Sequence, residues 1–146
     1  MEKKNLENNL KKYLDRKVIE FNNPSFIKDD PICIPHLFSL KQDIEIAGFF
    51  AAIFAWGTRK TIINKCKSLL QIMDNAPYDF CLHHKEKDLK RLERFCHRTF
   101  NDTDLLYFIS FFKFHYSKHD SLEPAFFNNR TIKQSNNTIE NSLNYF

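Results

Sequence analysis

The sequence predicts an all-α domain, an orthogonal bundle of about six helices around a phenylalanine-rich core and without a sheet. Only two of the 146 residues are glycine, so the chain has few of the tight turns that a hairpin-rich fold needs. The 16 phenylalanines supply large apolar side chains, and several segments place apolar residues at helical spacing. A chain of this length is long enough for one domain with its own core.

The first 40 residues divide into a helix and an irregular segment. Apolar residues from Leu6 to Phe21 fall on one stripe of a helix, with charged residues on the other sides. Three prolines lie between Pro24 and Leu40 and disfavour a regular helix there. We therefore expect a loop that packs its apolar residues onto the body of the domain.

A pair of central helices is predicted between Ser39 and Met73. Ser39 and Gln42 have the spacing of a capping box that begins the first helix. This helix is apolar on all sides up to Trp56, which is typical of a helix enclosed by others, and Gly57 suits its C-terminal end. Thr58 suits the N-cap of the second helix, which continues with helical apolar spacing.

The second half of the chain predicts further helices and a change of composition near its end. Asp102 or Thr103 is expected to cap a helix whose aromatic side chains fill the core. These helices are expected over residues 78–83, 86–96 and 104–118, with one more turn over 121–127. We expect one domain over residues 1–127, and the asparagine-rich residues 128–146 to form a loop or the start of another element.

The residues Gly57, Thr58, Arg59 and Lys60 form the first candidate site. A helix N-terminus offers free N–H groups and a partial positive charge, and two basic side chains accompany it here. A DNA or RNA phosphate is the anion that such a turn would bind. The segment lacks the pattern of a Walker phosphate loop, and a solvated corner between two helices is the alternative.

A second candidate is a polar cluster of unknown role formed by His36, His97, Arg98 and Asp104. Such side chains can form a binding or catalytic site, or they can satisfy the backbone groups at helix ends. The four cysteines and their neighbouring histidines match no standard zinc spacing. We therefore expect no metal and no cofactor.

Charge and hydropathy restrict the partners. The formal net charge of +4, from 22 basic and 18 acidic residues, permits a nucleic-acid partner without requiring one. The N-terminus has no apolar segment of the kind found in secretory signals. The longest uncharged run, from Ile46 to Thr58, is shorter than the ~20 residues that a membrane span needs. We expect a cytoplasmic protein that does not enter a membrane.

Several separate motifs resemble a bacterial family known as domain of unknown function 2400, over the region from the first helix to Phe127. They are Asp29-Asp30-Pro31-Ile32, Ile34-Pro35-His36 with Phe38-Ser39, Asp43 to Ala52, Ala55-Trp56-Gly57, Asp74 to Phe80, His97 to Asn101 and Thr103 to Phe108. The members of this family are similar, more distantly, to the helix-hairpin-helix DNA glycosylases.

This resemblance implies a DNA-facing role for the turn from Trp56 to Lys60. It also implies that the hairpin and the catalytic carboxylate or lysine belong to a second half, and nothing after Asn128 matches them. The chain is therefore expected to be an N-terminal half that is not an enzyme by itself. The alternative is a structural or interaction fragment that packs against a missing C-terminal half or against itself.

Overall fold

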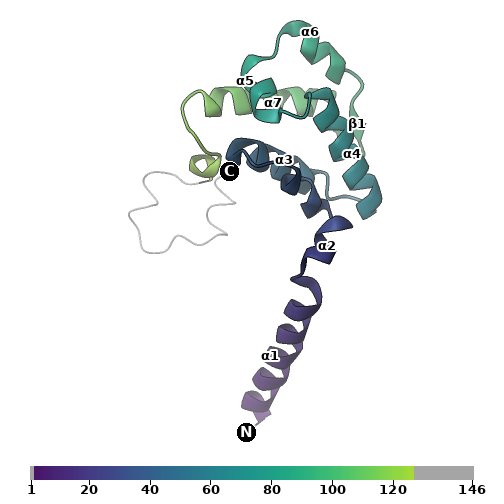
Figure 1. The fold of residues 1–146 in the computed structure, drawn as a ribbon, viewed down its shortest axis with the longest axis vertical. Helices are drawn as coiled ribbons and strands as arrows, with labels where there is room; N and C mark the ends of the chain where they lie inside the picture. Colours follow the sequence, from purple (N-terminus) through teal and green to yellow (C-terminus); the bar gives the residue numbers. More distant parts are fainter. Residues whose placement is uncertain (1, 127–146) are drawn as a thin grey trace.

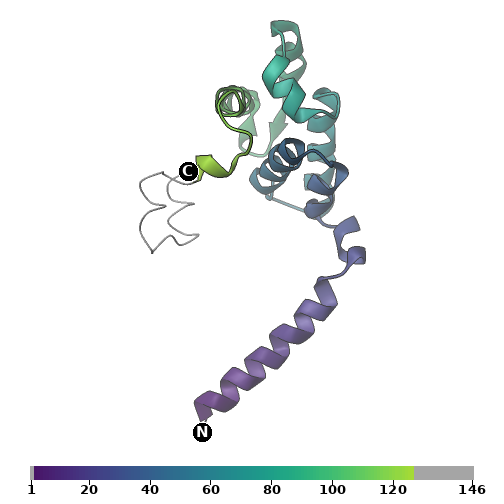
Figure 2. The same ribbon diagram turned by 60° about the vertical axis from the view of Figure 1, so that its left-hand side comes forward.

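The computed structural model of the chain describes residues 2–126, with side chains from residue 6 onward. The predicted all-α class is confirmed, and the segment 128–146 lies outside the described residues. Helices from both halves of the sequence pack into one body, from which the first helix extends as a separate arm (Figures 1 and 2). The α-helices are α1 (Glu2–Phe21), α2 (Pro24–Lys28), α3 (Lys41–Ile53), α4 (Arg59–Ile72), α5 (Pro77–His83), α6 (Glu86–Leu89) and α7 (Asp102–Tyr116).

Short 3-10 helices and one small hairpin complete the described part of the chain. The 3-10 helices are η1 (Pro31–Cys33), η2 (Pro35–Leu37), η3 (Lys90–Leu92) and η4 (Glu123–Ala125), and the strands are β1 (Cys96–His97) and β2 (Phe100–Asn101). The expectation of no sheet is wrong at this hairpin, which pairs the two strands in antiparallel register. The helix expected over residues 86–96 is shorter, because α6 and η3 end before Glu93, whose ψ of 138° leaves the helical region, and Arg94 follows with a φ of 66°.

The proline-containing segment is helical, so the loop predicted there is wrong. Pro24, Pro31 and Pro35 each begin a short helix, where the missing N–H would have no partner in any case. The side chain of Asn23 caps α2, and that of Asp30 caps η1. The prolines therefore start helices here and do not exclude them.

The ends of α3 differ from the prediction. Ser39 does not cap the helix, whose N-cap is Leu40, and Gln42 donates instead to the backbone carbonyl of Asp120 at 2.8 Å. The helix ends at Ile53, and Gly57 lies in the following turn. The expectation that other elements enclose it is also wrong at this end, because 37% of Ile53 is exposed.

The predicted caps of the next two long helices are partly confirmed. Thr58 caps α4, and its hydroxyl accepts from the Thr61 N–H at 3.3 Å. Helix α7 is capped by Asn101 instead of Asp102 or Thr103, and Asp104 accepts reciprocally from the Asn101 N–H at 3.0 Å. The capping pattern was present in the sequence one residue earlier than expected.

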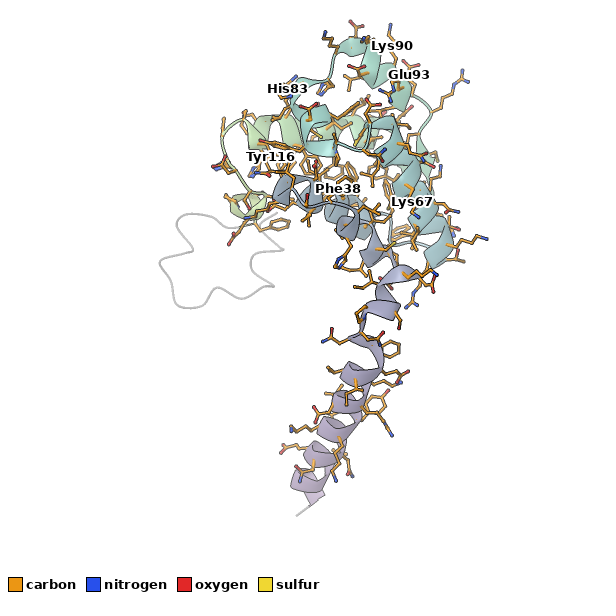
Figure 3. The ribbon with its side chains drawn as sticks, in the orientation of Figure 1. Phe38, Lys67, His83, Lys90, Glu93 and Tyr116 are labelled. Carbon is orange, nitrogen blue, oxygen red and sulfur yellow. The ribbon has the colours of Figure 1, made fainter. Side chains whose placement is uncertain are left out.

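The core is rich in phenylalanine, as predicted. Phe50, Phe54 and Phe112 are fully buried, and they come from α3, the turn that follows it and α7. Side chains fill the space between the helices of the body, whereas those of α1 project outward from the arm (Figure 3). The rings of Phe50 and Phe112 meet edge to face with their centroids 5.8 Å apart. Such pairs contribute about 0.5–1.5 kcal/mol beyond the area that they bury. Direct ring contacts thus hold α3 and α7 against each other.

Helix α1 presents an apolar stripe that remains exposed. Leu10, Leu14 and Val18 are each about half exposed, and Ile19 is 80% exposed. A helix of this kind obtains little stability from packing in the described structure. None of the helices in the described residues combines the length and apolar character needed to cross a membrane.

The carboxylate of Glu45 fastens the end of α7 and the following segment to α3. It accepts hydrogen bonds from the Tyr116 hydroxyl at 2.9 Å, the Ser121 hydroxyl at 2.7 Å and the Leu122 N–H at 2.8 Å. Burial and the Glu45 carboxylate raise the pKa of Tyr116, which therefore stays protonated as the hydrogen-bond donor. One side chain thus joins two segments that are far apart in the sequence.

We predict that Glu45→Ala lowers the free energy of unfolding by about 3 kcal/mol, because three partly buried donors lose their acceptor. Lys41→Ala is the control, since Lys41 only approaches the same carboxylate at 3.8 Å and is largely exposed. The control is expected to change stability by less than about 0.5 kcal/mol. Urea unfolding followed by circular dichroism measures both, and equal stabilities would contradict the role assigned to Glu45.

Candidate binding cleft

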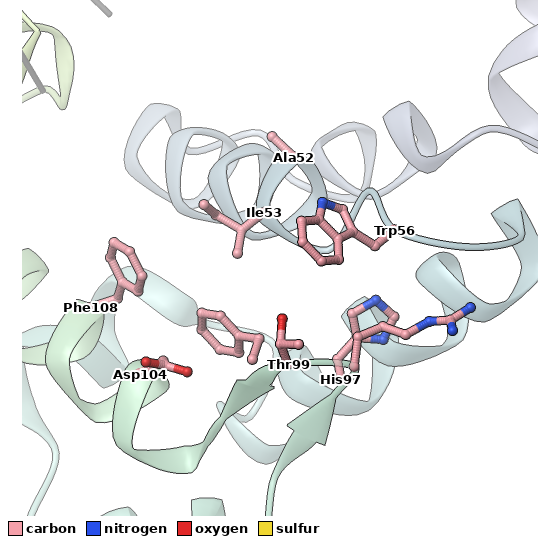
Figure 4. Close-up of a pocket in the computed structure, with 9 residues that line it drawn as sticks. Ala52, Ile53, Trp56, His97, Thr99, Asp104 and Phe108 are labelled. Atoms are coloured by element: carbon pink, nitrogen blue, oxygen red, sulfur yellow. The ribbon is translucent and has the colours of Figure 1, made fainter. Parts of the chain in front are cut away.

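A cleft of about 470 Å3 lies between the C-terminal end of α3 and the β1–β2 hairpin. Figure 4 shows Ala52, Ile53 and Trp56 on one side, and Thr99, Asp104 and Phe108 on the other. Its lining residues are Ala52, Ile53, Trp56, His97, Arg98, Thr99, Phe100, Asp104 and Phe108. The cleft therefore combines three aromatic rings with polar and charged side chains.

Trp56 lies at the mouth of this cleft because α3 ends early. The Phe54 ring is fully buried, and the Trp56 N–H bonds to the Phe54 carbonyl at 2.6 Å, which closes a tight turn. The turn leaves 62% of Trp56 exposed. A large ring that is held by a folded turn and still faces solvent is suited to contact a ligand.

Arg98 lies against the glycine of that turn. Gly57 has a φ of 122°, which side-chain-bearing residues rarely adopt, and a Cβ there would lie 2.9 Å from Nη2 of Arg98. Arg98 itself has a φ of 60°, as the turn between β1 and β2 requires. The glycine thus leaves room for the guanidinium, which has no ion pair among the described residues.

His97 joins the hairpin to the end of α3. The side chain is 4% exposed, and its Nε2 lies 3.0 Å from the Phe54 carbonyl oxygen. A carbonyl oxygen only accepts, so Nε2 carries the proton and donates. The His97 and Phe54 rings are also in contact, with centroids 5.2 Å apart. His97 thus positions the cleft walls and has its Nε2 already occupied.

Asp104 provides the negative charge of the cleft. Its carboxylate accepts from the Asn101 N–H at 3.0 Å and stabilises the start of α7. The side chain is only half buried and lies in the cleft wall (Figure 4). Arg98 and Asp104 therefore make the cleft cationic in one part and anionic in another.

The structure brings together parts of both predicted sites. Arg98 lies beside Gly57, and His97, Arg98 and Asp104 line one cleft. His36 lines a separate groove next to α1 and is not among the residues of this cleft. Arg59 is turned toward Asp30, with 3.3 Å between Nε and the carboxylate oxygen. Lys60 is exposed and has no ion pair among the described residues.

Arg59 also lies over an aromatic ring. Its guanidinium carbon is 5.4 Å from the centroid of the Phe26 ring. The contact is within the range of a cation–π interaction. Arg59 therefore helps to dock α2 onto the start of α4 and is less available to an anion than Arg98 and Lys60.

Sequence reasoning missed the aromatic part of this cleft. Phe100 and Phe108 stack with centroids 6.1 Å apart and an interplanar angle of 15°. The sequence predicts that the buried helix continues to Trp56 and ends at Gly57, whereas α3 ends at Ile53 and leaves Trp56 exposed. The proximity of Phe100 to Trp56 depends on the tertiary fold and had no signal in the sequence.

Burial disfavours the reactive thiolate form at three of the four cysteines. Burial raises the pKa of Cys66 and that of Cys81 to about 12, so both remain protonated near neutral pH. Burial also raises the pKa of Cys33. No group of three histidine, cysteine, aspartate or glutamate side chains in the described part of the chain is arranged to hold a metal ion.

Fold and cleft together define an all-α domain with a small amphipathic cleft at the junction of a helix end and a hairpin. The chain belongs to the family described as Protein of unknown function (DUF2400), whose family model matches residues 30–146. The match begins after α1 and continues past Phe127, so the range expected from the sequence was wrong at both ends. No curated protein and no solved structure matches the chain.

We predict that Gly57→Ala lowers the free energy of unfolding by about 1–3 kcal/mol, because alanine is strained at this positive φ. Gly48→Ala is the matched control, since a Cβ at Gly48 would lie 3.7 Å from Pro35, which is an ordinary contact. Within a helix the control should stabilise the protein by about 0.5–1 kcal/mol. Thermal unfolding of the two variants measures this difference, and equal losses would contradict it.

Proposed function

We propose that this chain is a DNA-binding module whose phosphate contacts come from Arg98 and Lys60, beside the turn at Gly57. The observation that carries the proposal is the position of Arg98 beside Gly57, where Nη2 lies 2.9 Å from the place that a Cβ would take, so that one residue of each candidate site lies at the same turn. The distant resemblance to helix-hairpin-helix DNA glycosylases points to the same turn. Phosphate contacts of this kind contribute affinity without reading the base sequence.

The charges around the turn support this assignment. Arg98 and Lys60 have no carboxylate partner among the described residues, so their charges are available to an anion. The carboxylate of Asp30 partly neutralises Arg59 at 3.3 Å. We therefore assign Arg98 and Lys60 the larger contributions, with Arg59 in a supporting position.

The proposed module binds without chemistry of its own. The His97 ring donates to a backbone carbonyl at 3.0 Å, and Asp104 accepts from the Asn101 N–H at the start of α7. Both groups that are capable of acid–base work in this cleft thus have structural hydrogen bonds. Their geometry supports a binding site and not a catalytic pair.

We predict that Arg98→Ala and Lys60→Ala each weaken DNA binding. Each should also reduce the slope of log Kd against log salt concentration by about one, which is the contribution of one phosphate contact. Arg91→Ala is the charge-matched control, because Arg91 is already paired with Asp74 at 2.8 Å. Fluorescence anisotropy of a labelled oligonucleotide at several salt concentrations measures these effects. Binding that is indifferent to salt, or equally reduced by Arg91→Ala, would contradict the proposal.

A second candidate function is self-association through the open face of α3. A groove of about 590 Å3 lies beside α3 and is lined largely by apolar side chains, including Ile53 and Leu122. Exposed apolar surface of this kind is typical of interaction sites. On this hypothesis the module binds a second copy of itself, and Ile53 lies at the contact.

We predict for this second candidate that the wild-type chain has a solution mass above its monomer mass of 17.5 kDa and that Ile53→Glu restores the monomer. Ile19→Glu is the control, because Ile19 is 80% exposed on α1, far from the groove in the sequence. Light scattering coupled to size-exclusion chromatography measures the mass. A monomeric wild-type protein at high concentration would rule out this function.

A further inference from the structure

We propose that the DNA bound at this cleft is single-stranded and that an unpaired base stacks on Trp56 while Arg98 contacts a neighbouring phosphate. This inference rests on the proposed function and adds the form of the DNA to it. It is carried by three features of the cleft, namely an exposed indole, an adjacent unpaired cation and a carboxylate in the opposite wall.

The exposed indole favours an unpaired base. In a duplex, both faces of each base are covered by its neighbours in the stack, so an aromatic side chain at the surface finds no free face. An unpaired base offers its face, and stacking on an aromatic side chain tolerates any base sequence. Trp56 is 62% exposed, and the turn that contains it is held by the hydrogen bond that its backbone N–H donates to the Phe54 carbonyl.

The ring and the cation lie close enough to serve one strand. Arg98 Nη2 lies 2.9 Å from the position of a Cβ on Gly57, and Gly57 directly follows Trp56 in the chain. Consecutive Cα atoms are only about 3.8 Å apart. A stacked base and the phosphate of the same strand can therefore meet both groups. The combination of an aromatic platform and a basic groove is typical of single-strand binding.

The carboxylate of Asp104 decides which part of the nucleotide faces the cleft. A phosphate inside the cleft would be repelled by Asp104, whereas the amino and imino groups of a base can donate to it. The base is therefore expected on the cleft side, and the phosphate on the outer side near Arg98 and Lys60. Thr99 offers a hydroxyl to the same base edge.

The chain contains a single tryptophan, so tryptophan emission, excited selectively over that of the five tyrosines, reports on this site alone. We would titrate the full chain with three labelled ligands of equal length: a single strand, the corresponding duplex, and an abasic strand with the same number of phosphates. Anisotropy of the label reports binding of the phosphate backbone. Tryptophan emission reports contact between a base and Trp56.

We expect the single strand to quench Trp56 emission and to bind more tightly than both the duplex and the abasic strand. Trp56→Ala should weaken single-strand binding by about 5- to 150-fold, which corresponds to the loss of one base–aromatic stack. Trp56→Phe should recover part of that affinity. Tyr107→Ala is the control, because Tyr107 is 71% exposed on α7 and does not line the cleft.

Equal binding of the abasic strand and the single strand, with unchanged tryptophan emission, would overturn the inference and leave the proposed function intact. Preferential binding of the duplex would also overturn it. If anisotropy detects no binding of any of the three ligands, the proposed function fails together with the inference. Circular dichroism melts of each variant establish that a loss of binding is not a loss of the fold.

Discussion

The hydrogen bond from His97 Nε2 to the Phe54 carbonyl is the constraint on which the cleft depends. It joins a hairpin in the second half of the chain to the turn that directly follows α3, at 3.0 Å and away from solvent. The same carbonyl oxygen also accepts from the backbone N–H of Trp56 at 2.6 Å, so the two bonds together fix the turn after α3 against the hairpin. With these bonds in place, Phe54 is buried and Trp56, two residues later, is exposed to solvent. Arg98, the residue after His97, lies beside Gly57.

The sequence supported the long elements because their stability is encoded locally. Helix α4 was predictable from the Thr58 cap and its apolar spacing, and the phenylalanine-rich core from composition. The hairpin was not predictable, since two residues in each strand carry no periodicity and Arg98 gives no sign of its positive φ. The prolines were misread because a proline can begin a helix as well as prevent one.

The candidate site was predictable only in part, for a related reason. The residues Gly57 to Lys60 could be found from local composition, and so could the polar segment that contains His97 and Arg98. Their meeting is a contact between distant parts of the chain, which a single sequence does not reveal. The same holds for His36, which shares the chemistry of the cluster and lies in another groove. Side-chain chemistry alone therefore does not tell which of these residues lie together in the fold.

The two candidate functions make opposite demands on the exposed end of α3. A DNA-binding module needs the Trp56 ring exposed, with the cation of Arg98 beside it. Self-association would cover Ile53, three residues before Trp56, and would reduce the access of a ligand to the Trp56 ring. Ala52 and Ile53 line both the cleft and the apolar groove, so the two surfaces are continuous. Occupation of one surface is therefore expected to weaken occupation of the other, and a dimer that dissociates when DNA is added would place both functions at this helix end.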